Sequence, residues 1–180
     1  IVDGKLLTAN AAIGLYPANS IDDDVVLYTD ESRSQVLKIF HFLRQQTDKS
    51  NLRPGLPREN LCLADFVAPR ETGMADYIGG FVVTAGIGVD QMVGTLEATN
   101  DDYGAIMARA LADRLAEAFA ERMHERIRKE FWGYAPDESL HDQDFIKERY
   151  QGIRPAPGYP ACPDHTEKVA LWELLDAKRH

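Results

Sequence analysis

One long helical pattern, residues 101–132, constrains the fold of this chain more than any other feature. Asp101 and Asp102 lie in its first turn, where the helix dipole favours negative charge, and Gly133 follows its last turn, where glycine commonly ends a helix. Between residues 105 and 120 seven residues are alanine and only four side chains are polar, namely Arg109, Asp113, Arg114 and Glu117. This half of the helix is therefore predicted to be buried on nearly every side, and the charged half, residues 121–129, to be more exposed.

Short apolar stretches predict the strands. Residues 11–17 (AAIGLYP) and 25–29 (VVLYT) flank the run SIDDD, whose turn-forming residues predict an antiparallel hairpin. Residues 77–85 (YIGGFVVTA) have the best strand pattern, and the pair Gly79-Gly80 predicts a bulge or a close backbone contact. Residues 61–66 are compatible with a further short strand, which Asp65 interrupts.

Three more helices are predicted from spacing and capping residues. The capping box Ser32-x-x-Gln35 and the apolar residues after it predict a helix over residues 33–46. Shorter helices are predicted over residues 142–150 and 166–178. Because helices do not alternate regularly with strands, we expect an α+β fold with a mostly antiparallel, twisted sheet flanked by helices and the long Ala-rich helix at its centre.

Length and composition fit one soluble domain. A chain of 180 residues can build one core but is short for two domains. It begins at Ile1 rather than Met, so we interpret it as a piece of a longer protein. Residues 50–60 carry two prolines and a glycine and predict an exposed loop. No apolar run approaches the roughly 20 residues that span a membrane, and no secretion signal opens the chain, so a cytoplasmic location without membrane contact is expected.

Charge and cysteine usage exclude several functions. The net charge of −9 argues against nucleic acid as a partner and is compatible with a cationic ligand. Cys62 and Cys162 are 100 residues apart and form no C-x-x-C pair, so two reduced thiols are expected. The five histidines show no metal-ligand spacing, so no metal site is expected. No nucleophile stands beside an obvious base and no Gly-rich fingerprint follows a strand, so no catalytic residue is predicted.

The segment from Gln151 to Lys168 concentrates the residues with binding chemistry. Its four prolines (155, 157, 160 and 163) stiffen the chain, and Gly158 among them can take a positive φ or let a ligand approach the backbone. Arg154 offers a planar fork for a carboxylate, and Tyr159 offers an aromatic face and a hydroxyl. One interpretation is a stiff ligand-binding loop; the other is a plain connection in which Tyr159 fills the core.

The carboxylates of the long helix allow two interpretations as well. Asp113 and Glu117 are four residues apart, so they share one face. In the structural interpretation Arg109 neutralises Asp113 and Arg114 neutralises Glu117. In the functional one, both carboxylates point into a cleft and meet a cation or donor from outside the helix.

The segment RPAPGYPACPDHTEK (154–168) and four others resemble the C-terminal activation domain of cobalamin-dependent methionine synthase. The other segments are HFLRQQTDK (41–49), LADFVAP (63–69), MADYIGGFVVTAG (74–86) and LADRLAEAFAERMHERIRKEFWGYAP (111–136). The resemblance runs through essentially all 180 residues and implies a single activation domain, 1–180, truncated at both ends relative to the family. One family aspartate that binds the ligand belongs before Ile1, and one aromatic contact belongs after His180.

The resemblance implies that the domain binds S-adenosyl-L-methionine (AdoMet). Arg154 would take the ligand's carboxylate, Glu117 would balance its positive charge, and the loop from Pro155 to Pro160 would hold adenine and ribose. The implied contacts are Arg154, Ala156, Gly158, Tyr159 and Glu117. Asp113 is implied to face the cobalamin-binding domain.

The implied function is the reactivation of methionine synthase, a methyltransferase of methionine biosynthesis. AdoMet and a flavodoxin-like reductant would restore methylcobalamin from cob(II)alamin, with cobalamin bound by a different domain of the same enzyme. The isolated fragment is expected to be inactive alone. The alternative is a non-catalytic interaction module that docks the cobalamin domain or flavodoxin and binds no small ligand.

Overall fold

A computed structural model describes residue 4, residues 6–49 and residues 59–179 of the chain. The chain divides into two compact units. We call one the helical unit, formed by residues 1–12, 81–153 and 177–180, and the other the sheet unit, formed by residues 13–80 and 154–176. The predicted loop 50–60 falls almost wholly outside the described residues. No described helix is long and apolar enough to cross a membrane.

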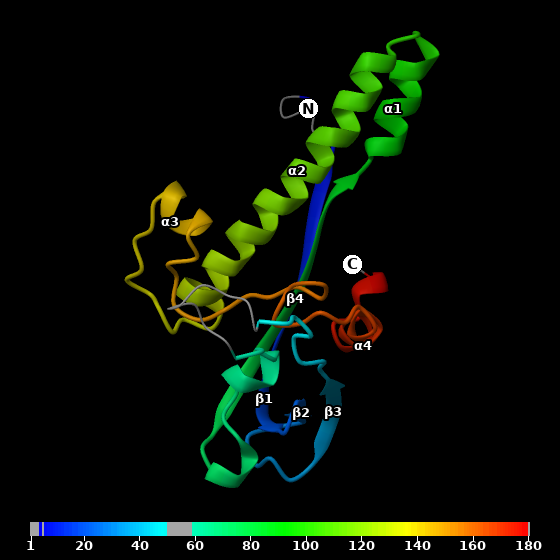
Figure 1. The fold of residues 1–180 in the computed structure, drawn as a ribbon. Coiled ribbons are helices and arrows are strands. Elements are labelled where there is room, and N and C mark those ends of the chain that lie inside the picture. The colour runs from blue at the N-terminus through cyan, green and yellow to red at the C-terminus, as the bar shows by residue number, and fades with distance from the viewer. Residues whose placement is uncertain (1–3, 5, 50–58, 180) are drawn as a thin grey trace. The chain divides into compact units, whose positions relative to one another are not determined.

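Four strands form one sheet in the order β3-β2-β1-β4 (Figure 1). They are β1 (Thr8–Ile21), β2 (Asp24–Tyr28), β3 (Val36–His41) and β4 (Asp76–Ile87). The β1–β2 and β2–β3 pairs are antiparallel, and β1 turns into β2 at the Ile21–Asp24 pair. This confirms the predicted hairpin and, with the flanking helices, the α+β class.

The predicted helix over residues 33–46 is wrong, because this stretch contains β3. Its central residues pair with β2, for example Phe40 with Val25, and the amide of Thr29 donates to the carbonyl of Gln35 at 3.1 Å to close the turn. Phe40 is 6% exposed in the core of the sheet unit. Burial against a neighbouring strand outweighs a local capping pattern that would also have suited a helix.

The segment 61–66 is not a strand, although the sequence was compatible with one. Leu63–Phe66 forms a short 3-10 turn, η1, and Arg70–Thr72 forms a second, η2. The carboxylate of Asp65 accepts a hydrogen bond from the amide of Cys62 at 2.9 Å, which closes η1. The residue that interrupts the strand pattern therefore makes the turn.

The strand predicted over residues 77–85 is confirmed as β4, and so is a close approach at its glycine pair. A Cβ added at Gly80 would lie 2.8 Å from Leu171 Cδ1, so the helix α4 (Glu167–Leu174) packs closely on this strand. Leu171 packs against the core of the sheet unit, whose buried members are Ala18, Val25, Leu27, Phe40, Cys62, Ala64 and Val67.

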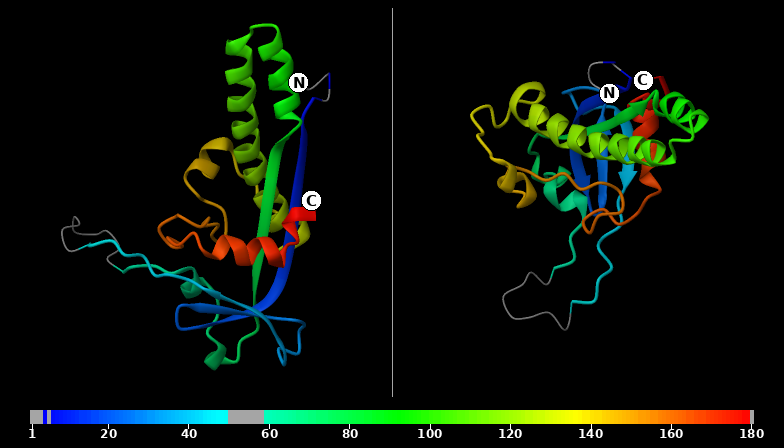
Figure 2. Two further views of the ribbon diagram at one scale, coloured as in Figure 1. Left: turned by 90° about the vertical axis from the view of Figure 1, so that its right-hand side faces the viewer. Right: turned by 90° about the horizontal axis from the view of Figure 1, so that it is seen from above.

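The helical unit is built on two helices that lie side by side, α1 (Val89–Ala98) and α2 (Asp102–Arg126) (Figures 1 and 2). The helix α2 confirms the long helical pattern: Asp101 Oδ1 accepts from the amide of Gly104 at 2.9 Å at its start. A π-helical turn, Ile127–Phe131, continues it, and Gly133 ends it with φ of 75°. The sequence did not predict α1.

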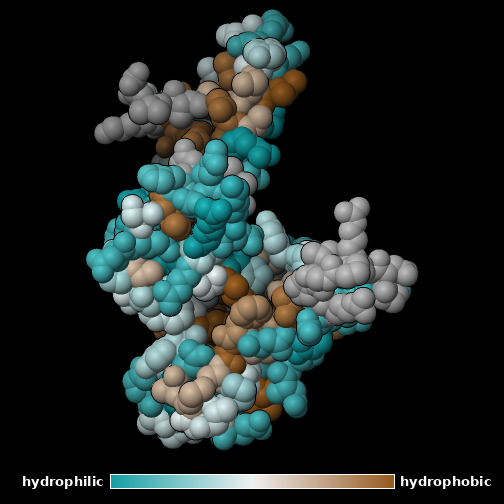
Figure 3. Space-filling model, turned by 60° about the vertical axis from the view of Figure 1, so that its left-hand side comes forward, coloured by the Kyte–Doolittle hydropathy of each residue, from teal (hydrophilic) through white to brown (hydrophobic). Residues whose placement is uncertain are grey.

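The prediction that the first half of α2 is buried is wrong. Only its alanine stripe, Ala105, Ala108 and Ala112, is buried, and the first two of these pack with Val93 of α1. Tyr103 and Ile106 are 76% and 66% exposed, and Figure 3 shows apolar surface at this end of the unit. Buried side chains lie further along, at Met123, His124, Ile127 and Arg128. A narrow stripe of alanines is enough to pack against one neighbouring helix. The other apolar side chains in this half of α2 are therefore not covered by α1.

The remaining helices are shorter than predicted. Over residues 142–150 only α3 (Asp142–Ile146) forms. Over residues 166–178, α4 ends at Leu174, Asp176 takes φ of 47°, and a 3-10 turn, η4 (Ala177–Arg179), follows.

Candidate functional site

Three of the six predicted site residues, Ala156, Gly158 and Tyr159, lie together in one turn-rich loop of the sheet unit, and Arg154 comes just before it. The amide of Gly158 donates to the carbonyl of Cys162 at 2.7 Å, and the amide of Cys162 donates to the carbonyl of Tyr159 at 2.9 Å. The amide of Tyr159 donates to Ala156 at 2.9 Å. These bonds close residues 156–162, which we call the Gly-Tyr loop, on themselves. The loop is therefore held in shape by hydrogen bonds of its own backbone.

Gly158 takes φ of 106°, a conformation that other residues rarely adopt. The prediction that Gly158 can take a positive φ is confirmed. Both Ala156 and Gly158 are exposed. Both residues therefore lie at the surface of the loop.

Tyr159 is 59% exposed, so it does not fill the core, and that interpretation of the loop is wrong. The loop is anchored by Cys162 instead, which is 2% exposed. Burial, its largest cause, raises the pKa of the Cys162 thiol to about 11, so the thiol is protonated at neutral pH. Cys62 and Cys162 are both free thiols, as the sequence predicted.

Arg154 precedes the Gly-Tyr loop and is half-buried. After the loop, the carboxylate of Asp164 accepts from the amide of Thr166 at 2.9 Å and from its hydroxyl at 2.6 Å. These two bonds hold the pKa of Asp164 below its usual range. They fix the chain just before α4, so the segment that leaves the loop is held in place.

Glu117 and Asp113 belong to α2 in the helical unit, and both are exposed. Arg114 Nη1 lies 2.7 Å from Glu117 Oε2, which confirms one of the two predicted helix pairs. Arg109 pairs with Glu97 of α1 at 3.4 Å rather than with Asp113, so the other predicted pair is wrong. The Arg114 and Glu117 side chains are 74% and 66% exposed. A pair so exposed is weak, and Glu117 can exchange it for another cation.

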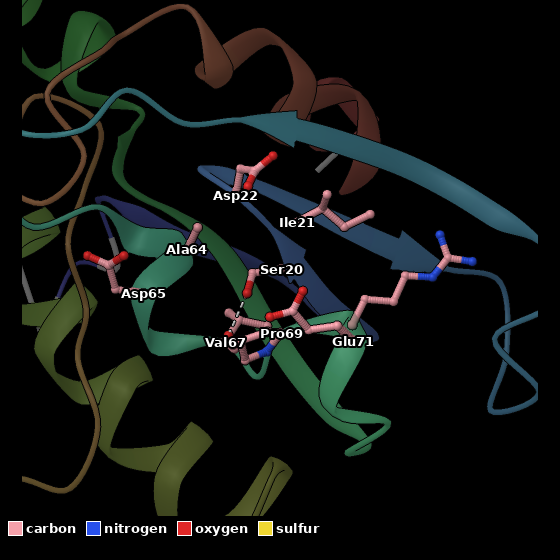
Figure 4. Close-up of a pocket in the computed structure, with 9 residues that line it drawn as sticks. Ser20, Ile21, Asp22, Ala64, Asp65, Val67, Pro69 and Glu71 are labelled. Carbon is pink, nitrogen blue, oxygen red and sulfur yellow. Dashed lines mark hydrogen bonds between the residues drawn. The ribbon is translucent and has the colours of Figure 1, made fainter.

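An open depression of about 770 Å³ lies elsewhere in the sheet unit (Figure 4). Ser20, Val67 and Pro69 are among its lining residues, and Ser20 Oγ donates to the Val67 carbonyl at 2.8 Å. Carboxylates of Asp65 and Glu71 also line it. None of the six predicted site residues is among the described residues that line this depression, so it is separate from the Gly-Tyr loop.

Sequence reasoning missed one residue beside the loop. A Cβ added at Gly158 would lie 2.5 Å from His165 Cε1 and 2.8 Å from its Nε2, so the imidazole packs directly on this glycine. The sequence offered only the seven-residue separation of the two, which indicates no contact. Among the described residues, no group of three or more His, Cys, Asp or Glu side chains could hold a metal ion.

Comparison with known proteins gives two findings. The family model for the activation domain of vitamin B12 dependent methionine synthase matches residues 1–180. A crystal structure of the MetH reactivation domain bound to AdoHcy is similar to this chain, with 55% sequence identity and a TM-score of 0.86. The similarity covers 97% of this chain and 52% of the solved chain, so the present chain spans about half the length of that relative.

Proposed function

Because the chain belongs to the family of vitamin B12 dependent methionine synthase activation domains, we propose that it binds AdoMet and supports reactivation of that enzyme. The observation that carries this proposal is the 55% identity to a reactivation domain that was solved with AdoHcy. AdoHcy is AdoMet without its transferable methyl group. Both ligands therefore present the same carboxylate, ammonium, ribose and adenine to a binding site.

The Gly-Tyr loop supplies the main part of the proposed site. It is closed by its own hydrogen bonds, so little conformational entropy is lost when it meets a ligand. The peptide groups at Ala156 and Gly158 would contact adenine and ribose, and the exposed ring of Tyr159 would cover them. Arg154, next in the chain, would bind the ligand's carboxylate through a charge-assisted pair.

Glu117 would complete the site from α2. It would exchange its exposed pair with Arg114 for the ligand's ammonium or sulfonium charge. Asp113, on the same helix face, would meet the cobalamin-binding domain of the same enzyme.

The reaction supported by the site is a methyl transfer to cobalamin, which another domain would hold as the substrate. A flavodoxin-like reductant would add one electron to cob(II)alamin. The methyl carbon of AdoMet would then form a bond to cobalt, while its bond to sulfur breaks and leaves the electron pair on AdoHcy. The domain's own residues would orient the sulfonium and exclude water, so they bind and position but are not themselves reactants. The isolated chain would have no turnover of its own.

The proposal is tested by calorimetric titration of the full-length gene product with AdoHcy and AdoMet. Arg154→Ala should weaken binding of both at least about tenfold, because an ion pair with a carboxylate is lost. Arg149→Ala is the matched control: Arg149 is 61% exposed and pairs with Asp144, so its loss should leave affinity unchanged. Absence of AdoHcy binding to the unsubstituted protein would overturn the proposal.

The exposed apolar side chains of α2 favour the alternative of a docking module that binds no small ligand. Tyr103 and Ile106 are more than half exposed on the helix that carries Asp113. Capture of the cobalamin-binding domain that is indifferent to AdoMet and to Arg154→Ala would support this alternative. Capture that depends on both supports the AdoMet site.

A further inference from the structure

The imidazole of His165 packs against the backbone of the Gly-Tyr loop at Gly158, where φ is positive. A side chain at residue 158 would make the exposed His165 ring shift, because an added Cβ would meet Cε1 at 2.5 Å and Nε2 at 2.8 Å. Cβ atoms essentially never approach other atoms this closely. Gly158 is thus favoured twice, by its φ of 106° and by the ring that occupies the space of a side chain.

The backbone of His165 is held in place independently of the ring. Asp164 accepts two hydrogen bonds from Thr166, one from its amide at 2.9 Å and one from its hydroxyl at 2.6 Å. The amide of Lys168 donates to the carbonyl of His165 at 3.2 Å, at the start of α4. The position from which the imidazole extends to the loop is therefore fixed by these hydrogen bonds.

We propose that His165 is a positioning residue of the AdoMet site: its ring braces Gly158 and keeps the Gly-Tyr loop in its binding conformation. This inference rests on the proposed function, and it adds a residue to the predicted site. The ring acts through packing on one side of the glycine, so the ligand is met by Tyr159 and the loop's peptide groups. Without the ring, the loop would keep its three hydrogen bonds but lose the contact that fixes Gly158.

The size of the effect follows from backbone entropy. Fixing one residue in a single conformation costs on the order of a tenfold factor in an equilibrium constant, and glycine has the most freedom to lose. His165→Ala should therefore weaken AdoHcy binding about tenfold. His165→Phe keeps a flat ring on Gly158 without the nitrogens, so its affinity should stay within about threefold.

The test compares these two variants in the full-length gene product by calorimetric titration with AdoHcy at 25 °C. His141→Ala is the control, because His141 is exposed like His165 but lies at the start of α3 in the helical unit rather than next to the Gly-Tyr loop in the sequence. Equal affinity of His165→Ala and the unsubstituted protein would overturn the positioning role. Equal weakening of His165→Ala and His165→Phe would overturn it too, because it would mean that a ring nitrogen contacts the ligand.

A double-variant cycle tests the contact itself. Gly158→Ala should weaken AdoHcy binding more in the unsubstituted protein than in the His165→Ala background, because removal of the ring makes room for the new methyl group. Strain from the positive φ remains in both backgrounds and cancels in the comparison. Equal effects in the two backgrounds would show that the ring and the loop are independent, against the proposal.

Hydrogen exchange separates this inference from the proposed function. The amide of Gly158 donates to Cys162 at 2.7 Å, so its exchange rate reports whether the loop is closed. Exchange at Gly158 should be about tenfold faster in His165→Ala, and unchanged in His165→Phe, with no ligand present. If the exchange rates follow this pattern but AdoHcy does not bind, the proposed function is overturned and the bracing role of His165 is not. Unchanged exchange in His165→Ala would overturn the bracing role whether or not AdoHcy binds.

Discussion

Arg44 and Asp65 form an ion pair whose loss with pH is predictable. Both guanidinium nitrogens of Arg44 lie 2.7 Å from the Asp65 carboxylate, and the Cys62 amide adds a third hydrogen bond at 2.9 Å. The bonds from Arg44, the largest cause, hold the pKa of Asp65 below its usual value. A carboxyl group with a lowered folded pKa stabilises the fold above its unfolded pKa of about 4, and this stabilisation disappears as the pH falls through the folded value.

Asp65→Asn should therefore lower the free energy of unfolding at pH 7 by up to about 1 kcal/mol, since the pair is partly exposed. The difference in the free energy of unfolding between Asp65→Asn and the unsubstituted protein should become smaller as the pH falls below about 4. Urea denaturation at pH 7 and pH 3 measures both quantities. Asp22→Asn is the control: Asp22 lines the same depression and forms none of the described ion pairs, so stability should not change. An equal difference in stability at both pH values would show that ionisation of Asp65 is not its cause.

Arg128 and Glu138 form the most buried ion pair among the described residues. The Arg128 side chain is fully buried, its Nη2 lies 2.6 Å from Glu138 Oε2, and its guanidinium lies 4.7 Å from the centre of the Tyr150 ring. The pair fastens Glu138 to the π-helical turn that continues α2, and Glu138 also accepts a hydrogen bond from the amide of Gln151. Removing one partner leaves the other charge buried without compensation.

Glu138→Ala should lower the free energy of unfolding by about 3 kcal/mol, measured by chemical denaturation. The double variant Arg128→Met with Glu138→Leu removes both charges and should recover at least half of that loss. A double variant no more stable than Glu138→Ala alone would show that the loss comes from packing rather than from the unpaired charge.

At the scale of elements, two glycines of the fold should respond oppositely to substitution. Gly94 lies within α1 with nothing within 4 Å of an added Cβ, so Gly94→Ala should stabilise the helix by about 0.5–1 kcal/mol. A Cβ added at Gly80 would lie 2.8 Å from Leu171 Cδ1, so Gly80→Val should destabilise the sheet unit by about 1–3 kcal/mol. Thermal unfolding of both variants tests this. A neutral Gly80→Val would mean that α4 does not pack closely on β4.

The elements that the sequence predicted well are those with unambiguous local patterns. The strand β4 and the helix α2 carry long runs of β-branched or helix-forming residues with suitable ends, and both form as expected. Residues 36–41 suit either a helix or a strand, and only their pairing with β2 decides between them. The helix α1 contains Gly94, which weakens a helix pattern, and it depends on packing between Val93 and the α2 alanines.

The candidate site was predictable in part for the same reason. The special backbone of Gly158 follows from a local rule about glycine among prolines, and the structure confirms it. The partners of charged residues depend on neighbouring elements, so the sequence could not assign Arg109 to Glu97. The contact of His165 with Gly158 depends on how the chain turns at Asp164, which no spacing rule describes.

For the whole molecule, we predict that ligand binding stabilises the protein. AdoHcy at about 100 times its dissociation constant adds about 2.7 kcal/mol, which corresponds to a rise in Tm of about 5–10 °C for a domain of this size. Thermal unfolding of the full-length gene product with AdoHcy measures this rise. Arg154→Ala should abolish most of it, whereas Arg149→Ala should keep it. A rise that survives Arg154→Ala would place the ligand elsewhere.

The most direct measurement is the rate at which the full-length gene product converts bound cob(II)alamin to methylcobalamin, followed by visible absorption, with AdoMet and a flavodoxin-like reductant. We predict conversion in the unsubstituted protein and in Arg149→Ala, and a rate at least about tenfold lower in Arg154→Ala at limiting AdoMet. Equal rates for Arg154→Ala and the unsubstituted protein, or no dependence on AdoMet, would contradict the proposed role of this chain.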